Sequence, residues 1–501
     1  MLSTRGQATH ARRGPYTLST RKSAFVLLAM ALMLAAALRF YRLGYADLSA
    51  DEAAAWAGAS APTVRAVIER EHLLDPGKLA LYDLALHGWI SLGGDSVKWM
   101  RSLSALLGLV VIVLVFAVTR ELILNLRVTI DVPGAELAGA FAALVAAANL
   151  TLINQARTTR MYPLTLMLEL GQVLCLLRAI SVRMSRAGRV ASLIGVTVTT
   201  TLAISSNFTA ALLVAAEASW LATLTAMRRL CPSAPAMNDA GPTGISAIHL
   251  LAPTMALITG IALLAPIVPA ASRTSIEVVH AGVLSWSHLR AAWWPLMVLR
   301  GASGKAPFPI LLGLALYGGW QMRSQNIAAL SFLLFWILGP IMLVIIISYA
   351  FTPFEETRYV IGSVAAFFIL AGIGIAEIAD VRLSLCLLAL LLAISLDHVR
   401  RDFAKPQFVQ WRAATTLALR AASPEDTIGV VPGYAVNAAR YYTPPALRAK
   451  VLPVMARCNA VHPRVMILAG GKLMSSEDLA AIRSCAPIVL ARWRLIEVRR
   501  R

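Results

Sequence analysis

The sequence predicts a polytopic α-helical membrane protein, of about eleven spans, followed by a C-terminal soluble α/β domain. Hydrophobic residues make up 58% of the chain and charged residues only 14%, whereas a soluble domain carries about 25% charged residues. The apolar residues fall into separate runs, most of them near the ~20 residues that a bilayer-spanning helix needs. This composition excludes a disordered chain, a disulfide-rich scaffold and a soluble enzyme.

The apolar runs fix the predicted order of spans along the chain. They are residues 24–43, 100–118, 135–152, 163–180, 190–206, 208–227, 246–268, 306–321, 327–349, 360–378 and 383–397. The first run follows a basic segment that includes Arg21 and Lys22. Because it is long for a signal peptide and many further runs follow it, we expect an uncleaved anchor.

Basic residues predict the orientation of these spans. They are frequent in the short loops between alternate spans, so the positive-inside rule places those loops and the N-terminal tail (residues 1–23) in the cytoplasm. An odd number of spans then puts the C-terminus outside. Two long loops, 44–99 and 269–305, lie outside and are rich in Trp, His and charge. Long structured outer loops indicate work at the outer membrane face.

The net charge of +20 does not indicate a nucleic-acid partner. Many basic residues flank the spans, where orientation requires them, and anionic membrane lipids are the natural counter-charge. We therefore expect membrane lipids, and no nucleic acid, among the partners.

Residues 405–501 change in pattern and predict a small α/β domain. An amphipathic helix is expected over 407–422, strands over 426–432, 464–469 and 487–498, and a short helix over 476–484, with Pro and Gly between them. Cys458 and Cys485 both fall here. In an oxidising compartment they can form a disulfide, and otherwise they are two unrelated thiols.

The first outer loop contains side chains that can carry chemistry. Asp51 and Glu52 follow the first span closely, and a carboxylate there can act as a general base or hold a divalent metal. The alternative is a helix N-terminus that favours negative charge. Further along, Lys78 and Tyr82 stand at the start of a predicted surface helix. Lys78 can neutralise a phosphate, or it is an interfacial lysine that reaches for the headgroups.

Two shorter outer loops carry arginine beside tyrosine. One contains Arg157, Arg160 and Tyr162, and the other contains Arg358 and Tyr359. Arginines on the outer side run against the positive-inside bias. Arginine with tyrosine can clamp a phosphate and its sugar, and the alternative for each pair is an aromatic-belt anchor.

Taken in order, these motifs resemble the membrane glycosyltransferases of the GT-C class, in particular the protein O-mannosyltransferases and the lipid A aminoarabinose transferases (family 39-like). The resemblance covers roughly residues 25–380. It is carried by an early Asp-Glu, Lys78 to Tyr82, Arg160-Met161-Tyr162 and Arg358-Tyr359. The family's Lys/His-Pro-Pro-Leu-x-Tyr stretch has Leu79 and Ala80 in place of its two prolines here.

The resemblance implies that residues 24–398 form a GT-C catalytic domain that takes a sugar from a polyprenyl-phosphate donor. Asp51 is then the base on the acceptor hydroxyl, and direct displacement inverts the anomeric centre. Glu52 then orients Asp51, binds the acceptor or helps to hold a metal. The resemblance does not decide whether the reaction uses a divalent metal. The implied donor phosphate- and sugar-binding residues are Lys78, Tyr82, Arg157, Arg160, Tyr162, Arg358 and Tyr359.

The same resemblance implies a hexosyl- or pentosyltransferase of the bacterial inner membrane, with residues 405–501 in the periplasm. The acceptor would be a protein or an envelope glycolipid or glycan. One alternative is a transporter or flippase of lipid-linked substrates, since Glu169 and Glu217 fall inside predicted spans. A second alternative is a transferase whose oligosaccharide donor is linked through pyrophosphate.

Overall fold

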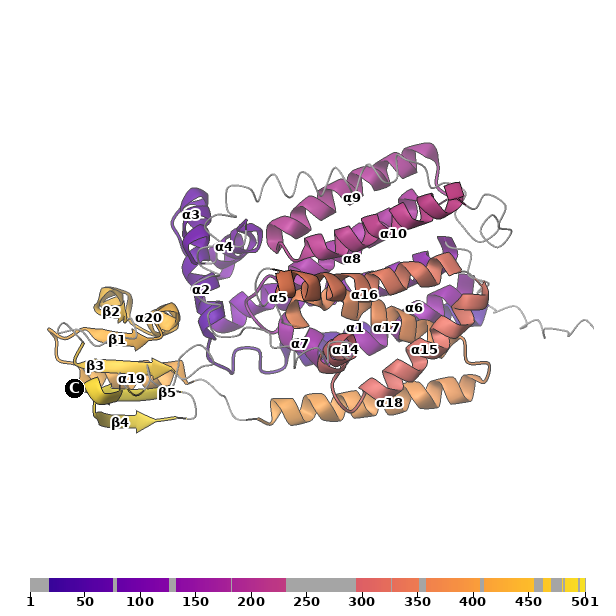
Figure 1. Ribbon diagram of the computed structural model, residues 1–501. Helices are drawn as coiled ribbons and strands as arrows, with labels where there is room; N and C mark the ends of the chain where they lie inside the picture. The colour runs from indigo at the N-terminus through magenta and orange to yellow at the C-terminus, as the bar shows by residue number, and fades with distance from the viewer. Residues whose placement is uncertain are drawn as a thin grey trace, which may run out of the picture.

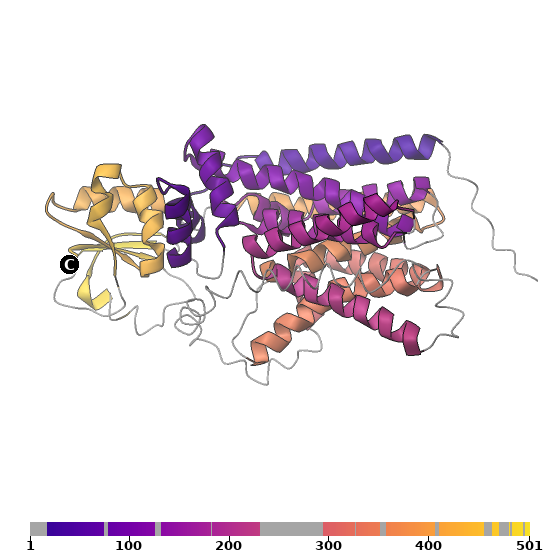
Figure 2. The same cartoon turned by 90° about the horizontal axis from the view of Figure 1, so that it is seen from above.

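The structure is a computed structural model, and its helical bundle, outer-loop helices and C-terminal sheet follow one another along one direction (Figure 1). It describes residues 18–74, 79–125, 132–181, 183–230, 294–325, 327–350, 357–405, 410–454, 463–469, 480, 483–493 and 496–500. The predicted span 246–268 and Lys78 lie outside the described residues. Figure 2 gives the same order from above, so the outer-loop helices separate the sheet from the bundle.

The bundle contains most of the predicted spans as helices. Its elements are α1 (Leu18–Phe40), α5 (Val97–Asn125), α6 (Val132–Ala147), α7 (Leu150–Ala156), α8 (Tyr162–Ala179), α9 (Arg186–Ser206), α10 (Ala210–Leu230), α14 (Trp294–Ser303), α15 (Phe308–Gln325), α16 (Ile327–Ala350), η2 (Thr357–Val360), α17 (Ile361–Ala376) and α18 (Val381–Phe403). Of the described helices, 6 are long and apolar enough to cross a membrane, or up to 7 when α6 and α7 count as one span bent by 67°. The chain is thus a multi-pass membrane protein, and the predicted count of eleven is not confirmed.

Helix α17 runs through the centre of the bundle. Every residue of α17 is buried, and it packs against α6, α15 and α16. A side chain on Gly374 would collide with the carbonyl oxygen of Leu314, and one on Gly372 would collide with Ala142. Small residues let helix backbones approach closely in a membrane. The glycines of Gly372-Ile373-Gly374 therefore allow close helix packing, and η2 directly precedes the N-terminal end of this central helix.

Three short helices of residues 44–99, the loop predicted to lie outside, cap one end of the bundle, and we call them the outer-loop helices. They are α2 (Ala50–Ala59), α3 (Val64–Leu74) and α4 (Leu81–Gly93). The stacked indoles of Trp89 and Trp99, with ring centroids 4.7 Å apart, join α4 to α5. A side chain at Gly93 would overlap the Trp99 ring. Glycine is required there because the two helices meet so closely.

The C-terminal residues form a mixed five-stranded sheet with its helices. The elements are α19 (Trp411–Ala421), β1 (Ile428–Val431), η3 (Gly433–Ala435), α20 (Val436–Tyr441), η4 (Pro445–Lys450), β2 (Val451–Pro453), β3 (Val465–Ala469), β4 (Ile488–Arg492) and β5 (Ile496–Arg500). The strand order is β2-β1-β3-β5-β4. The β2–β1 and β1–β3 pairs are parallel, and the β3–β5 and β4–β5 pairs are antiparallel. Helix α19 packs against β3 and β5.

The structure corrects one detail of the predicted C-terminal domain. The single strand expected over 487–498 is two antiparallel strands, because the chain reverses after β4 and Trp493 donates its backbone N–H to the carbonyl of Ile496 at 2.7 Å. That turn contains no Gly or Pro, so the sequence does not signal it. Most of the helix expected over 476–484 lies outside the described residues. Cys485 is disulfide-bonded, and Cys458 lies outside the described residues.

The C-terminal sheet domain contacts the first outer loop directly. The hydroxyl of Tyr442 accepts a hydrogen bond from the backbone N–H of Leu48 at 2.9 Å. The Tyr441 hydroxyl donates to the carbonyl of Asp95 at 2.8 Å, and its ring meets Trp56 edge-on with centroids 5.0 Å apart. Helix α2 consequently lies between the bundle and the sheet domain, in contact with α20 and η3.

Candidate active site

The start of α2 is fixed by a capping box. The Ser49 hydroxyl accepts the backbone N–H of Glu52 at 3.3 Å, and the Glu52 carboxylate accepts the backbone N–H of Ser49 at 3.0 Å. This reciprocal pair satisfies two N–H groups that a helix N-terminus otherwise leaves unpaired. The residues Asp51 and Glu52 thus stand in the first helical turn immediately outside the membrane-spanning helix α1.

Glu52 is buried, and its carboxylate is fully engaged. Its two oxygens accept Nε and Nη2 of Arg101 at 2.8 and 2.9 Å. The backbone N–H of Thr159 donates to the same carboxylate at 2.9 Å. Burial alone would raise the pKa of Glu52, but the Arg101 charge and these hydrogen bonds outweigh it and lower the pKa. Glu52 is therefore an ionised anchor between α2, α5 and the turn before α8.

Arg101 extends this anchor to the end of the first span. Its side chain is only 5% exposed. Besides Glu52 it donates to the carbonyls of Leu43 at 3.1 Å, Ala46 at 2.8 Å and Asp47 at 3.0 Å. A guanidinium presents five N–H donors in a rigid fork. Arg101 uses that fork to hold the whole segment that leads from α1 into α2.

Asp51 points the other way from Glu52. Adjacent helical residues are rotated by about 100°, and the Asp51 side chain is 51% exposed. Its carboxylate lies 3.3 Å from Nη1 of Arg358, and its backbone carbonyl accepts Nη1 of Arg160 at 3.2 Å. An accessible carboxylate thus stands beside the Arg358 guanidinium, and a second guanidinium, that of Arg160, binds the backbone of the same residue.

Two tyrosines complete this group of side chains. The Arg358 guanidinium lies over the rings of Tyr162 and Tyr359, 5.8 and 5.5 Å from their centroids. Burial raises the pKa of Tyr162, although the neighbouring Arg160 and Arg358 charges act against it. We call Asp51, Arg160, Tyr162, Arg358 and Tyr359 the Asp51 cluster. Its members come from α2, the turn before α8, the first residue of α8, and η2.

Tyr82 lies behind the Asp51 cluster. It is only 2% exposed, and its hydroxyl is 2.9 Å from that of Ser104. The Ser104 hydroxyl in turn donates to the carbonyl of Arg160 at 3.2 Å. Tyr82 thereby supports the turn that carries Arg160.

Arg157 is separated from the Asp51 cluster. Its guanidinium stacks on Phe403, 4.4 Å from the ring centroid, and donates to the carbonyls of Leu38 and Tyr41. It lines a different pocket, of about 400 Å³, at the junction of α1, α7 and α18. The structure consequently brings together five of the nine predicted site residues, places Glu52 and Tyr82 behind them, and sets Arg157 apart, while Lys78 lies outside the described residues.

Comparison with known proteins finds similar folds but no matching sequence family. No family model matches the chain, and no curated protein matches its sequence. ArnT from Cupriavidus metallidurans in the apo state is structurally similar, with a TM-score of 0.56 and 13% identity over 96% of this chain and 98% of that one. The same protein bound to undecaprenyl phosphate gives a TM-score of 0.55 and 13% identity over 95% and 98%. The chain has the GT-C fold.

A second GT-C structure extends the likeness. The archaeal oligosaccharyltransferase AglB from Archaeoglobus fulgidus, in complex with an inhibitory peptide and a dolichol-phosphate, gives a TM-score of 0.55. Its identity is 10% over 90% of this chain and 70% of that one. At such identities the likeness establishes the fold. The role of each residue must come from its own contacts.

The GT-C fold of this chain does not present Asp51 and Glu52 to one ligand. Glu52 is bound to Arg101, while Asp51 faces Arg358. Within the parts of the chain that the structure describes, no group of three or more His, Cys, Asp or Glu side chains gathers in a way that could hold a metal ion.

The GT-C bundle also contains two acids, and the carboxylate of Glu169 lies against Gly362 at the start of α17. Glu217 accepts the amide of Gln172 at 2.6 Å, and Glu169 and Glu217 are both buried. They come from α8 and α10 and pack within the bundle.

The structure also identifies two residues to which the sequence assigned no role. Arg101 looks like an ordinary basic residue beside a span, and only its distant partner Glu52 gives it a function. Ser49 carries a detectable signal, because Ser followed three residues later by Glu is the capping-box pattern.

Proposed function

We propose that this protein is a glycosyltransferase that moves a sugar from a polyprenyl-phosphate donor to an acceptor hydroxyl at the outer face of the membrane. The observation that carries the proposal is the Asp51 cluster. An accessible carboxylate and two guanidinium groups, from segments far apart in sequence, meet where outer-loop helices join the spans. A solved GT-C structure bound to undecaprenyl phosphate supports the donor class.

Asp51 is the proposed general base. Its carboxylate accepts the proton of the acceptor hydroxyl while that oxygen bonds to the anomeric carbon of the sugar. The bond from the anomeric carbon to the phosphate oxygen breaks, and its electron pair leaves with the lipid phosphate. This single displacement inverts the anomeric centre. A positioned base of this kind contributes ~10²–10⁴-fold in rate.

Arg358 and Arg160 are the proposed phosphate ligands. A phosphate is a good leaving group that needs little protonation, so fixed positive charge is the main requirement where negative charge develops. A guanidinium can bind two phosphate oxygens at once. A phosphate on Arg358 would also compete with the carboxylate of Asp51, 3.3 Å away. Donor binding would thus free the base for the acceptor.

Tyr162 and Tyr359 are the proposed walls of the donor site. Both rings lie against the Arg358 guanidinium, which limits the directions in which its N–H groups can point. Glu52 has a different role in this proposal. It holds the backbone that carries Asp51, through Arg101 and Thr159.

The proposed orientation places the Asp51 cluster and residues 405–501 on the outer side of a bacterial inner membrane. Residues 1–23 would be cytoplasmic and residues 24–398 would form the catalytic domain. The support is that α2, α3 and α4 lie at the same end of the bundle as the sheet (Figure 1), and that Arg-rich short loops favour the opposite side.

A transfer assay tests this function. Purified full-length protein is incubated with radiolabelled polyprenyl-phosphate sugars and an envelope extract. We expect transfer that falls by ~10²–10⁴-fold in Asp51→Asn and persists in Glu69→Gln. The control residue is an exposed acid of the same outer loop, paired with Arg65. Full transfer by Asp51→Asn would remove Asp51 as the base.

The released lipid separates the proposed donor from its nearest alternative. Lipid monophosphate as the product supports the proposal, whereas lipid pyrophosphate indicates an oligosaccharide donor linked through pyrophosphate. If folded protein releases neither lipid monophosphate nor lipid pyrophosphate from any donor, the result favours a transporter. Glu169 and Glu217 are then the residues to substitute.

A further inference from the structure

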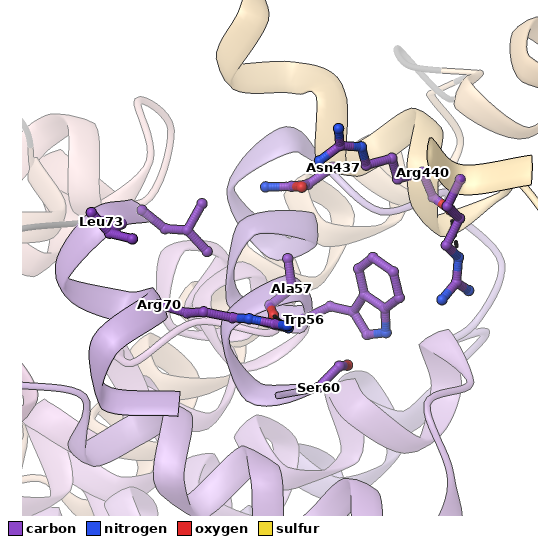
Figure 3. A pocket seen from close by; sticks show the side chains of 9 residues that line it. Trp56, Ala57, Ser60, Arg70, Leu73, Asn437 and Arg440 are labelled. Atoms are coloured by element: carbon purple, nitrogen blue, oxygen red, sulfur yellow. Dashed lines mark hydrogen bonds between the residues drawn. The ribbon is translucent and has the colours of Figure 1, made fainter. Parts of the chain in front are cut away.

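A pocket with an apolar wall, which includes Leu73 and Leu74, and with three arginines at its edge lies between helices α2 and α3 and the C-terminal sheet domain. It has a volume of about 460 Å³, within the range typical of small-molecule sites. We call it the arginine pocket. It is lined by Trp56 and Ala57 of α2, Arg70 of α3, Asn437 and Arg440 of α20, and Arg448 of η4. Figure 3 shows Arg70, Asn437 and Arg440 arranged around the turn of α2 that carries Trp56 and Ala57.

The arginine pocket is strongly electropositive. Its lining includes three arginines and no carboxylate. Among the described residues, none of these arginines forms an ion pair with an acid. The carboxylate of Asp95 accepts the indole N–H of Trp56, another lining residue, at 3.1 Å.

Each of these arginines keeps hydrogen-bond donors for a ligand. Arg70 uses Nη1 on the carbonyl of Ala57 at 3.3 Å. Arg440 uses Nε on that of Val451 at 3.0 Å, and Arg448 uses Nε on those of Arg440 and Thr443. Since a guanidinium has five N–H groups, each of the three keeps N–H groups beyond these contacts. The Arg448 guanidinium also lies over the Trp56 ring, 4.9 Å from its centroid.

The position of the arginine pocket relates it to the Asp51 cluster. Asp51 begins α2, and Trp56 and Ala57 lie about 8 Å further along the same helix axis. Tyr434 in η3, three residues before Asn437, is close enough to Asp51 that the carboxylate contributes, after burial, to raising the pKa of the Tyr434 hydroxyl. A molecule held in the pocket can therefore extend past Tyr434 toward Asp51.

We propose that the arginine pocket binds an anionic group, a phosphate or carboxylate, on the acceptor sugar, and so selects acidic saccharides as acceptors. This inference rests on the proposed glycosyl transfer. The pocket is lined by α2 and α3 and by α20 and η4 of the sheet domain (Figure 3), while Arg358 and Tyr359 belong to η2 of the bundle. It therefore adds an acceptor subsite beside the donor site.

Binding without donor tests the pocket independently of transfer. Full-length protein in detergent is titrated calorimetrically with glucose 6-phosphate and glucuronate, and with glucose as the neutral match. We expect the two anions to bind measurably more tightly than glucose. Arg70→Gln should weaken them roughly 10-fold, and Arg440→Gln with Arg448→Gln roughly 100-fold. Equal binding of glucose, or unchanged affinity in the variants, would overturn the proposal.

Two controls exclude a general charge effect and a folding defect as causes of weaker binding in this titration. Arg65→Gln removes a charge from the same helix outside the pocket, where Arg65 pairs with Glu69. It should leave affinity unchanged, and an equal loss would mean a diffuse surface-charge effect, against the proposal. Arg70 is an exposed residue, so Arg70→Gln should fold even if the double variant does not.

Vesicles identify the source of the anion. Phosphatidylethanolamine vesicles are compared with and without a phosphorylated diglucosamine lipid. Binding of the glycolipid vesicles with the same arginine dependence supports the pocket and places the anion on a lipid acceptor. Binding of the soluble saccharides alone supports a glycan or protein-linked acceptor. Binding of neither overturns the proposal.

Transfer kinetics distinguish failure of the pocket from failure of the proposed function. When the acceptor fraction is known, the Arg70→Gln variant should raise the acceptor KM roughly 10-fold and leave kcat and the donor KM unchanged. Asp51-dependent transfer with an unchanged acceptor KM refutes the pocket alone. Arginine-dependent binding without any transfer refutes the proposed reaction alone.

Discussion

Asp51 and Glu52 are neighbours in sequence, yet the structure predicts opposite effects of their amide variants. Glu52→Gln keeps the size of the side chain but removes its charge. Arg101 is then a buried cation, with a side chain only 5% exposed, whose partner has become neutral. Breaking one side of a buried ion pair costs about 3–5 kcal/mol, a large share of the ~5–15 kcal/mol that stabilises a folded protein.

Asp51→Asn should behave differently because Asp51 is half exposed. Its ion pair with Arg358 lies at the surface of the site, where such pairs contribute about 0–1 kcal/mol. Purified variants in detergent can be compared by their thermal unfolding midpoints and by transfer. We expect Glu52→Gln to unfold at a clearly lower temperature, and Asp51→Asn to keep the wild-type midpoint while losing transfer.

A double variant sharpens this comparison. Glu52→Leu with Arg101→Met removes both buried charges, and such replacements can recover stability. The recovery of stability should be incomplete here, since Arg101 also donates hydrogen bonds to the carbonyls of Leu43, Ala46 and Asp47. A wild-type midpoint for Glu52→Gln, or a matching drop for Asp51→Asn, would refute the assignment of Glu52 as anchor.

Three further outcomes are expected. Arg358→Lys keeps the charge but loses the planar fork, so the donor KM should rise roughly 10-fold; an unchanged donor KM would separate Arg358 from the phosphate. The lowered pKa of Glu52 gives a stabilisation that is complete above its ordinary pKa of 4.5 and is lost as pH falls through the lower folded value. The gap in unfolding midpoint between wild type and Glu52→Gln should therefore narrow in acid, and a constant gap would contradict the ion pair. Tyr82→Phe removes the contact with Ser104 and should lower stability by about 0.5–1.5 kcal/mol. Its transfer rate should stay within roughly tenfold of wild type, and a larger loss would mean that Tyr82 touches the donor.

The sequence predicts the members of the Asp51 cluster together because they share a membrane position. Asp51, Arg160 and Arg358 each follow or precede a predicted span on the outer side, and that common depth is readable from hydropathy and charge. The structure brings these three together. Their lateral proximity depends on how the helices pack, which hydropathy does not encode.

Sequence alone does not reveal contacts that depend on a distant partner. Glu52 and Arg101 are far apart in the chain and become a pair only in the fold. Arg157 carries the same kind of motif as Arg160, but a turn of chain directs it to Phe403 instead. Local sequence cannot distinguish two arginines that differ only in which way their backbone turns.

The fold was predicted most reliably where the pattern was long. Apolar runs such as 327–349 coincide with helices. The short strand β2 (Val451–Pro453) was missed, because it contains only three residues and ends in proline. Its place at the sheet edge comes from pairing with β1.

The Glu52–Arg101–Thr159 network has a consequence for how the protein is made. Its parts leave the ribosome in the order α2, α5 and the turn before α8, and helices enter the membrane as they are synthesised. A nascent chain that ends before Arg101 holds Glu52 without its counter-ion, and one that ends before Thr159 lacks the backbone N–H that completes the carboxylate's hydrogen bonds. The outer loop that bears Asp51 therefore reaches its final conformation only after the segment up to residue 159 has been synthesised. The Asp51 cluster itself is complete only when η2, which carries Arg358, has also been synthesised.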